Sequence, residues 1–169
     1  MKIVVLTCEE DDVLLRLARE ITEGVREANE NSVLIKNTFE ESIADAELVF
    51  FGFTTHRKLF WSYASERAVR ALRENAGSWK EKKLALFAVC YGEAARSAMA
   101  DAVREASAVG ARVVNTLAVV AQRTRQGGWE ASEIDLARAR GFGERTTNNA
   151  KGVAVFRPSE KQRIKKYLR

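Results

Sequence analysis

Five short apolar runs, separated by stretches with helical spacing, limit what this chain can fold into more than any other feature. The most apolar run, residues 47–52, reads ELVFFG and has the character of a strand buried on both faces. Strands that alternate with helices form βαβ units, which require a parallel sheet with right-handed crossovers. The predicted strands are 2–7, 32–36, 47–52, 83–90 and 112–120.

Helical periodicity fills most of the segments between these strands. In residues 11–29, for example, Leu14, Leu17 and Ile21 recur at helical spacing. Gly110 is predicted to end one helix and Ser132 to cap another. The predicted helices are 11–29, 61–75, 94–108 and 133–146, with a short helix or turn at 39–46, a polar loop at 54–60 and a Gly-containing loop at 122–129.

Length and composition favour one globular domain. The chain has 169 residues, of which 46% are hydrophobic and 30% charged, and no run approaches the ~18 apolar residues that a membrane span needs. The first six residues are too short a run for a signal peptide. Cys8 and Cys90 are too few for a disulfide framework, so we expect a cytoplasmic protein.

Positive charge is concentrated at the C-terminus. Residues 159–169 carry five basic side chains against one acid, whereas the formal charge of the whole chain is only +5. We therefore divide the chain into a domain at 1–157 and a basic C-terminal helix or tail at 158–169. Nucleic-acid readers usually carry a basic face on the folded body, so a nucleic-acid partner is disfavoured. The tail is a candidate docking site for an acidic protein.

Three segments resemble the flavodoxin family, and their pattern is closest to the flavodoxin domains of flavo-diiron proteins. They are SIADAELVFFGFTT at 42–55, VCYGEA at 89–94 followed by VGARVV at 109–114, and SEIDLARARGFGE at 132–144. The resemblance implies a doubly wound α/β fold with a five-stranded parallel sheet in the order 2-1-3-4-5 and helices on both faces, three layers in all. It also implies FMN at the carboxyl ends of the strands.

The resemblance assigns the flavin ring to the loops after the third and fourth strands. The second of these lacks the tryptophan and the spacer glycine of the family pattern SYGWxG. His56 is the only histidine, which leaves no room for the usual catalytic triads, so we expect no catalytic residue. The residues implied to contact the ring, if FMN is bound, are Thr54, Thr55, His56, Trp61, Cys90, Tyr91 and Gly92.

The two cysteines follow the first and the fourth strands. In the order 2-1-3-4-5 these strands have the third strand between them, which puts their axes ~9.6 Å apart. That separation exceeds the ~7 Å limit between the Cα atoms of a disulfide. We therefore expect Cys8 and Cys90 to be buried free thiols.

The loop after the first strand departs from the family. Where the family's phosphate loop offers hydroxyls and a glycine, this chain reads Glu9-Glu10-Asp11-Asp12. Carboxylates at a helix N-terminus cap its free N–H groups and would repel a phosphate. The first reading is thus an acid-capped helix without a phosphate site, and a Mg²⁺ or Ca²⁺ site is an alternative.

Two main functions remain open at this point. The first is a non-catalytic interaction or accessory module with weak or no FMN binding, which docks on a redox or accessory protein. The alternative is an FMN-binding electron-transfer flavodoxin that uses altered loops, an electron carrier rather than an enzyme. A nucleic-acid accessory role for the basic tail is a third hypothesis, and no membrane partner is expected.

Overall fold

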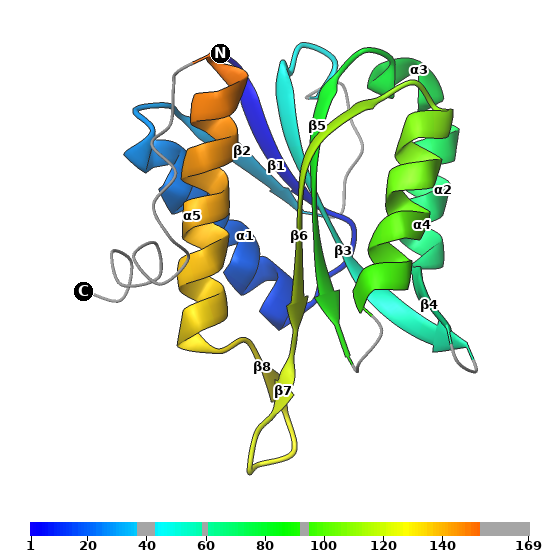
Figure 1. Ribbon diagram of the computed structural model, residues 1–169, viewed down its shortest axis with the longest axis vertical. Helices are drawn as coiled ribbons and strands as arrows, with labels where there is room; N and C mark the ends of the chain where they lie inside the picture. The colour runs from blue at the N-terminus through cyan, green and yellow to red at the C-terminus, as the bar shows by residue number, and fades with distance from the viewer. Residues whose placement is uncertain (37–42, 59–60, 92–94, 153–169) are drawn as a thin grey trace.

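The computed structural model describes residues 1–36, 43–58, 61–91 and 95–152. A parallel sheet in the order β2-β1-β3-β5-β6 forms the centre (Figure 1), which confirms the predicted five-stranded arrangement. No helix in these ranges is long and apolar enough to cross a membrane. The parallel strands are β1 (Ile3–Thr7), β2 (Ser32–Lys36), β3 (Leu48–Lys58), β5 (Lys83–Cys90) and β6 (Arg112–Val120).

Helices cover both faces of this sheet. In Figure 1, α1 and α5 lie on one side, and α2, α3 and α4 lie on the other. The predicted three layers are therefore present, and the basic tail at 158–169 falls outside the described residues. The helices are α1 (Asp12–Glu27), α2 (Glu66–Glu74), α3 (Ala76–Trp79), α4 (Ala95–Ala108) and α5 (Glu133–Ala150).

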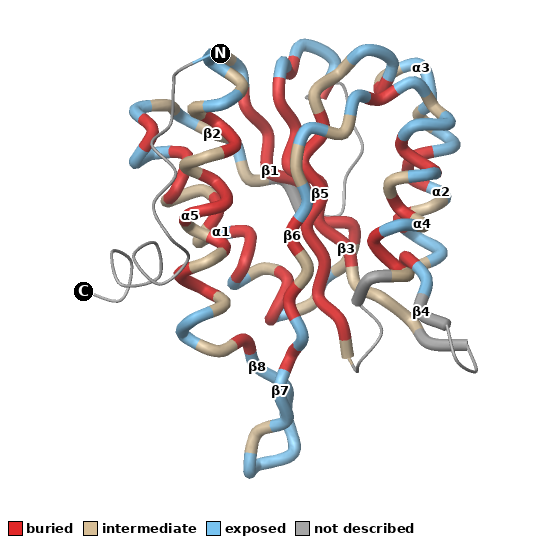
Figure 2. Tube along the Cα trace, in the orientation of Figure 1, coloured by how far each residue is buried: buried red, intermediate tan, exposed pale blue. Residues whose placement is uncertain are grey.

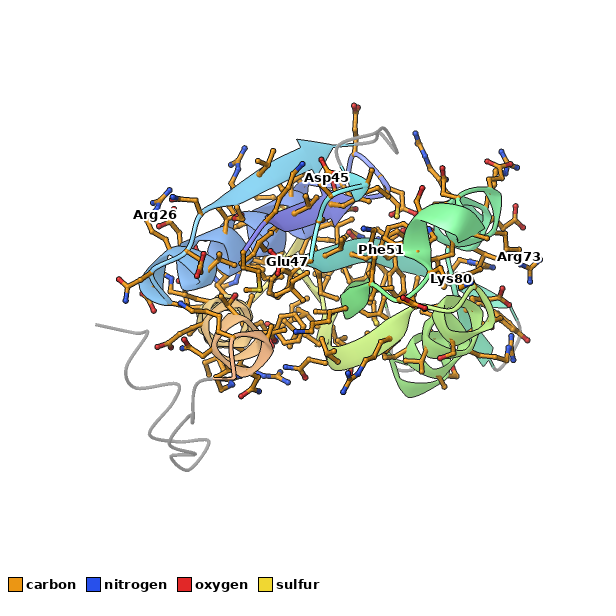
Figure 3. The ribbon with its side chains drawn as sticks, turned by 90° about the horizontal axis from the view of Figure 1, so that it is seen from above. Arg26, Asp45, Glu47, Phe51, Arg73 and Lys80 are labelled. Carbon is orange, nitrogen blue, oxygen red and sulfur yellow. The ribbon has the colours of Figure 1, made fainter. Side chains whose placement is uncertain are left out.

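Two hydrophobic cores follow from the alternation of side chains along the strands. Phe50 points to the α1 and α5 side, where its ring meets Phe142 edge to face at 5.7 Å. The next residue, Phe51, points to the other side and meets Trp79 at 5.5 Å. Figure 2 shows β1, β5 and the first part of β3 as continuously buried, and Figure 3 shows Phe51 between the layers.

Helices α1 and α5 approach each other closely at two glycines. A Cβ atom on Gly24 would lie 1.9 Å from the carbonyl oxygen of Arg140, and one on Gly143 would lie 2.3 Å from that of Ile21. Only hydrogen fits at such distances, so these glycines set how near the two backbones come. This contact holds the C-terminal half of α1 close against α5.

The structure corrects the prediction for residues 54–75. Instead of a loop at 54–60 and a helix that begins at Trp61, β3 continues to Lys58 and pairs antiparallel with β4 (Trp61–Ala64). The helix begins only after Ser65, whose hydroxyl accepts a bond from the Ala68 N–H at 3.2 Å. The prediction was wrong because Trp61 and Ala64 fit the helical spacing of α2, although β-branched and aromatic residues favour the hairpin.

Other predicted boundaries hold more closely. The strands at 32–36, 83–90 and 112–120 have the predicted limits, and Gly110 adopts the left-handed conformation (φ 81°) expected of a helix end. The Ser132 hydroxyl caps α5 through the Asp135 N–H, but the helix runs to Ala150 rather than 146. The loop at 122–129 contains a short hairpin of β7 (Gln122–Arg123) and β8 (Trp129–Glu130).

Candidate functional site

The carboxyl ends of β1, β3 and β5 bring together most of the predicted site residues. In open α/β sheets, ligands bind in the crevice beyond these ends. Thr54 ends the parallel part of β3, opposite Val89 on β5, and Tyr91 follows β5 directly. In Figure 1 this edge is the lower end of the sheet, from which the β7–β8 hairpin projects.

Glu9 ties the loop after β1 to the start of α2. Its carboxylate accepts the backbone N–H of Thr54 at 3.1 Å and also accepts the hydroxyl of Ser65. Burial raises the pKa of the Glu9 carboxyl, and the bonds from Ser65 and Thr54 oppose the rise. Thr54 is the last residue of β3 that pairs with β5, and its backbone N–H is therefore already bonded to the Glu9 carboxylate.

Asp11 performs two tasks with its two carboxylate oxygens. One oxygen accepts the Leu14 N–H at 2.8 Å, which makes Asp11 the N-cap of α1. The other accepts the hydroxyl of Tyr91 at 2.5 Å. The prediction of an acid-capped helix is thus confirmed for Asp11, and Glu10 and Asp12 are more exposed.

An aromatic pair adjoins these carboxylates. The rings of Tyr91 and Trp129 meet edge to face at 5.2 Å, and the guanidinium of Arg123 lies 5.8 Å from the centre of the indole. Burial and the bond to Asp11 raise the pKa of the Tyr91 hydroxyl, and the charges of Asp11, Asp12 and Glu9 add to the rise.

Sequence reasoning missed Trp129 and Arg123 because it treated residues 122–129 as a loop. The signal was present in Gly127-Gly128, since paired glycines between short polar strands are typical of a hairpin turn. Ser65 was also missed. Its position before Glu66 is a helix-start signal, but its bond to Glu9 joins residues 56 positions apart, which no local pattern reveals.

The remaining predicted ring contacts do not all gather at one place. Thr55 and Cys90 are joined by a side-chain hydrogen bond beside Tyr91. His56 stacks on Tyr63 at 5.9 Å and lines a groove of about 720 Å³ with residues of α2 and α4, such as Arg70 and Asp101. Gly92 and the side chain of Trp61 lie outside the described part of the chain.

The two cysteines are free and buried, as expected. Burial raises the pKa of both thiols, and the charge of Glu9 adds to the rise at Cys8. Because the thiolate is the nucleophile, a raised pKa makes these thiols unreactive near neutral pH. As for the alternative of a cation at the acidic loop, the described residues hold no cluster of three or more potential ligands that could bind a metal.

Comparison with known proteins identifies the architecture. No family model matches the chain, and no curated protein sequence matches it. Among solved structures, a flavodoxin from the domain Archaea superposes with a TM-score of 0.70 at 16% identity, covering 89% of this chain and 99% of that protein. Flavodoxin from Megasphaera elsdenii gives a TM-score of 0.67 at 15% identity, covering 86% of this chain and 98% of the other. The chain has the flavodoxin-like fold.

The flavodiiron protein from Giardia intestinalis gives a TM-score of 0.67 at 17% identity. The match covers 98% of this chain but only 37% of that protein, so the flavodoxin-like domain described here corresponds to one part of a longer relative. The likeness that the sequence indicated, to flavodoxins and to flavodiiron domains, is therefore confirmed at the level of the fold.

Proposed function

We propose that this flavodoxin-like domain is a non-catalytic interaction or accessory module that binds FMN weakly or not at all. One observation carries the proposal. Glu9 and Asp11 accept hydrogen bonds from the Thr54 and Leu14 amides, both of which border the loop where the family resemblance would put the FMN phosphate. The residues present do not fit a phosphate, because the chain's own carboxylates already use these donors.

The magnitudes favour exclusion of a phosphate. Two unit charges ~4 Å apart interact by about 4 kcal/mol at an effective dielectric constant near 20. A phosphate at this loop would face repulsion from Glu9 and Asp11 and would also compete for their donors, each worth about 1.5–3 kcal/mol to a charged acceptor. Nanomolar affinity corresponds to about −12 kcal/mol, so these two losses remove most of the binding free energy.

A protein partner is the natural ligand of such a module. We expect a redox or accessory protein with an acidic surface, which docks on the basic residues at 158–169. The test compares the full chain with a chain that lacks residues 159–169. We expect an acidic protein that co-purifies with the full chain not to bind to the shortened chain. Binding that survives the deletion would contradict the docking site.

The purified full chain tests the cofactor side of the proposal. After incubation with excess FMN and removal of free ligand, we expect a colourless protein without flavin absorbance. A yellow protein with one FMN per chain would refute the proposal.

A second candidate function is FMN-dependent electron transfer through altered loops. It is favoured by Tyr91 and Trp129, which supply aromatic surface at the edge where the family resemblance assigns the flavin ring. Trp129 comes from the β7–β8 hairpin and stands in for the tryptophan absent from residues 89–94. The same incubation with FMN separates the two candidates, because only the second predicts retained flavin.

A further inference from the structure

A small cavity lies at the amino ends of β5 and β6, away from the carboxyl edge at which β1, β3 and β5 end. Lys83 begins β5, Arg112 begins β6, and the two residues are paired in register. In Figure 1 both strands begin at the upper end of the sheet, opposite the β7–β8 hairpin. The cavity has a volume of about 180 Å³ and is lined by both cations, by Val114 and Asn115 of β6, and by Thr146 and Asn149 of α5.

A bulge in β6 places Asn115 on the side of the sheet that faces α5. The pairing of β6 with β5 shifts by one residue at Val114, which has no counterpart on β5. Because side chains alternate along a strand, this extra residue puts Asn115 on the same face as Arg112. The Asn115 side-chain amide accordingly donates to the Thr146 hydroxyl on α5 at 2.8 Å. Bulges that redirect a side chain in this way are over-represented beside functional sites.

The positive charge of this cavity is not balanced by an acid. Among the described residues, no aspartate or glutamate lines the cavity, and neither Lys83 nor Arg112 forms an ion pair. The Lys83 ammonium donates to the Ala150 carbonyl at 3.0 Å and carries further donors, and the Arg112 guanidinium is exposed. The Thr146 hydroxyl accepts its bond from Asn115 and still has its own proton to donate.

The size and the charge of the cavity fit a small oxyanion. Its volume of about 180 Å³ equals that of about six water molecules at ~30 Å³ each, whereas drug-sized ligands occupy pockets of ~300–1,000 Å³. An ammonium and a guanidinium on adjacent strands can both make charge-assisted hydrogen bonds to one doubly charged oxyanion. At the carboxyl edge, by contrast, Glu9 and Asp11 already occupy the donors.

We propose that the amino ends of β5 and β6 bind a small dianionic oxyanion, either free phosphate or the phosphate group of a small phosphorylated molecule. Lys83 and Arg112 supply the charge, and Thr146 and Asn149 supply neutral donors. This inference goes beyond the proposed function and is independent of it, because it concerns the opposite edge of the sheet.

Titration of the ¹⁵N-labelled full chain with inorganic phosphate tests the site. At constant ionic strength, with chloride replaced by phosphate, we expect saturable shifts in the backbone N–H signals of residues 112–115 and 146–150. The dissociation constant should be ~1 mM or lower and should rise with added salt. A parallel titration with glycerol 3-phosphate distinguishes the two sources of the ligand, since the tighter binder of the two identifies the natural class.

Two sets of variants locate the binding. Arg112→Gln should weaken phosphate binding about tenfold, the loss expected for one charge-assisted hydrogen bond, and adding Lys83→Gln should weaken it further. Arg112→Lys keeps the charge but loses the planar fork, so it should weaken binding less than Arg112→Gln. The control Arg19→Gln, Arg125→Gln removes the same charge from two exposed arginines on other elements and should leave the affinity unchanged.

The variant Arg112→Gln keeps the result interpretable, because Arg112 is exposed and its loss leaves the other signals of the spectrum in place. Phosphate shifts that do not saturate below ~10 mM would overturn the inference. So would shifts confined to other parts of the chain, or a loss of affinity in the control as large as that in the Lys83 and Arg112 variants, since either result describes a general attraction to basic residues.

Discussion

Two glutamates that bond to opposite ends of α2 meet contrasting electrostatic surroundings. Glu105 on α4 is 8% exposed and accepts two bonds from the guanidinium of Arg73, at 2.8 and 2.9 Å, which lower the pKa of its carboxyl. Glu9 accepts its bonds from an amide and a hydroxyl, which are neutral, and burial raises its pKa. Between α2 and α4, the charge of Glu105 is balanced by the guanidinium of Arg73. At the carboxyl edge, Glu9 is hydrogen-bonded only by the neutral Thr54 N–H and Ser65 hydroxyl among its contacts described above.

This difference explains why the carboxyl edge is unfavourable for a phosphate. A neutral N–H donor stabilises the one anion to which it is bonded. The Thr54 N–H is already bonded to Glu9 and the Leu14 N–H to Asp11, so neither can also bond to a phosphate. A guanidinium like that of Arg73 could have balanced an additional anion. At the carboxyl edge, the charge of Arg67 only partly offsets the rise in the pKa of Glu9, and Glu10 and Asp12 add more exposed carboxylates.

The largest effect is expected at Glu9, if its bonds hold the loop closed. Glu9→Ala leaves the Thr54 amide and the Ser65 hydroxyl without their acceptor and should lower the free energy of unfolding by about 2 kcal/mol. Urea denaturation measures the loss. Glu10→Ala, the exposed neighbour, is the control and should change stability by less than about 0.5 kcal/mol. Equal effects of the two variants would contradict the role of Glu9.

A smaller effect is expected at Asp11, where the cap and the Tyr91 bond are separable. Asp11→Ala should cost about 1 kcal/mol, because it removes the N-cap of α1. Asp11→Asn keeps a side-chain oxygen for the Leu14 N–H and should recover most of that loss, measured again by urea denaturation. If Asn is as destabilising as Ala, the carboxylate charge rather than the cap stabilises the helix.

The smallest effect is a pair of opposite pH dependences. The folded chain holds the Glu9 proton to higher pH than the unfolded chain. The contribution of Glu9 is therefore full below its unfolded pKa of ~4.3 and is lost as the pH rises through the raised folded value. The contribution of Glu105 is full above ~4.3 and is lost as the pH falls through the lowered folded value.

Stability curves of Glu9→Gln and Glu105→Gln against pH test this contrast. Relative to the parent chain, Glu9→Gln should gain stability as the pH rises from about 4 toward neutrality, and Glu105→Gln should gain it as the pH falls below about 4. Two curves that slope in the same direction would show that the surroundings of the two glutamates do not differ as described.

The sequence predicted the sheet well because buried strands are signalled locally. Residues 83–90 form a continuous apolar run with a single interpretation, and their order among the helices leaves few topologies. The segment at 54–64 was predicted wrongly because its side chains fit two periodicities, and tertiary pairing of β3 with β4 decided between them.

The candidate site was only partly predictable. The acids after β1 stood out as residues that break the family pattern. The preference of carboxylates for the N-terminus of a helix correctly predicted that one of them, Asp11, caps α1. Their long-range partners could not be foreseen, because Glu9 reaches Ser65 and Asp11 reaches Tyr91 through the fold alone. The contact between Trp129 on β8 and Tyr91 after β5 likewise joins residues that are far apart in the sequence.

Calorimetric titration of the full chain with FMN tests the central claim most directly, since that claim is that Glu9 and Asp11 already occupy the donors a phosphate would need. We predict no heat of binding at micromolar FMN, and measurable binding once Glu9→Gln and Asp11→Asn are combined. Nanomolar binding to the unaltered chain would contradict the account.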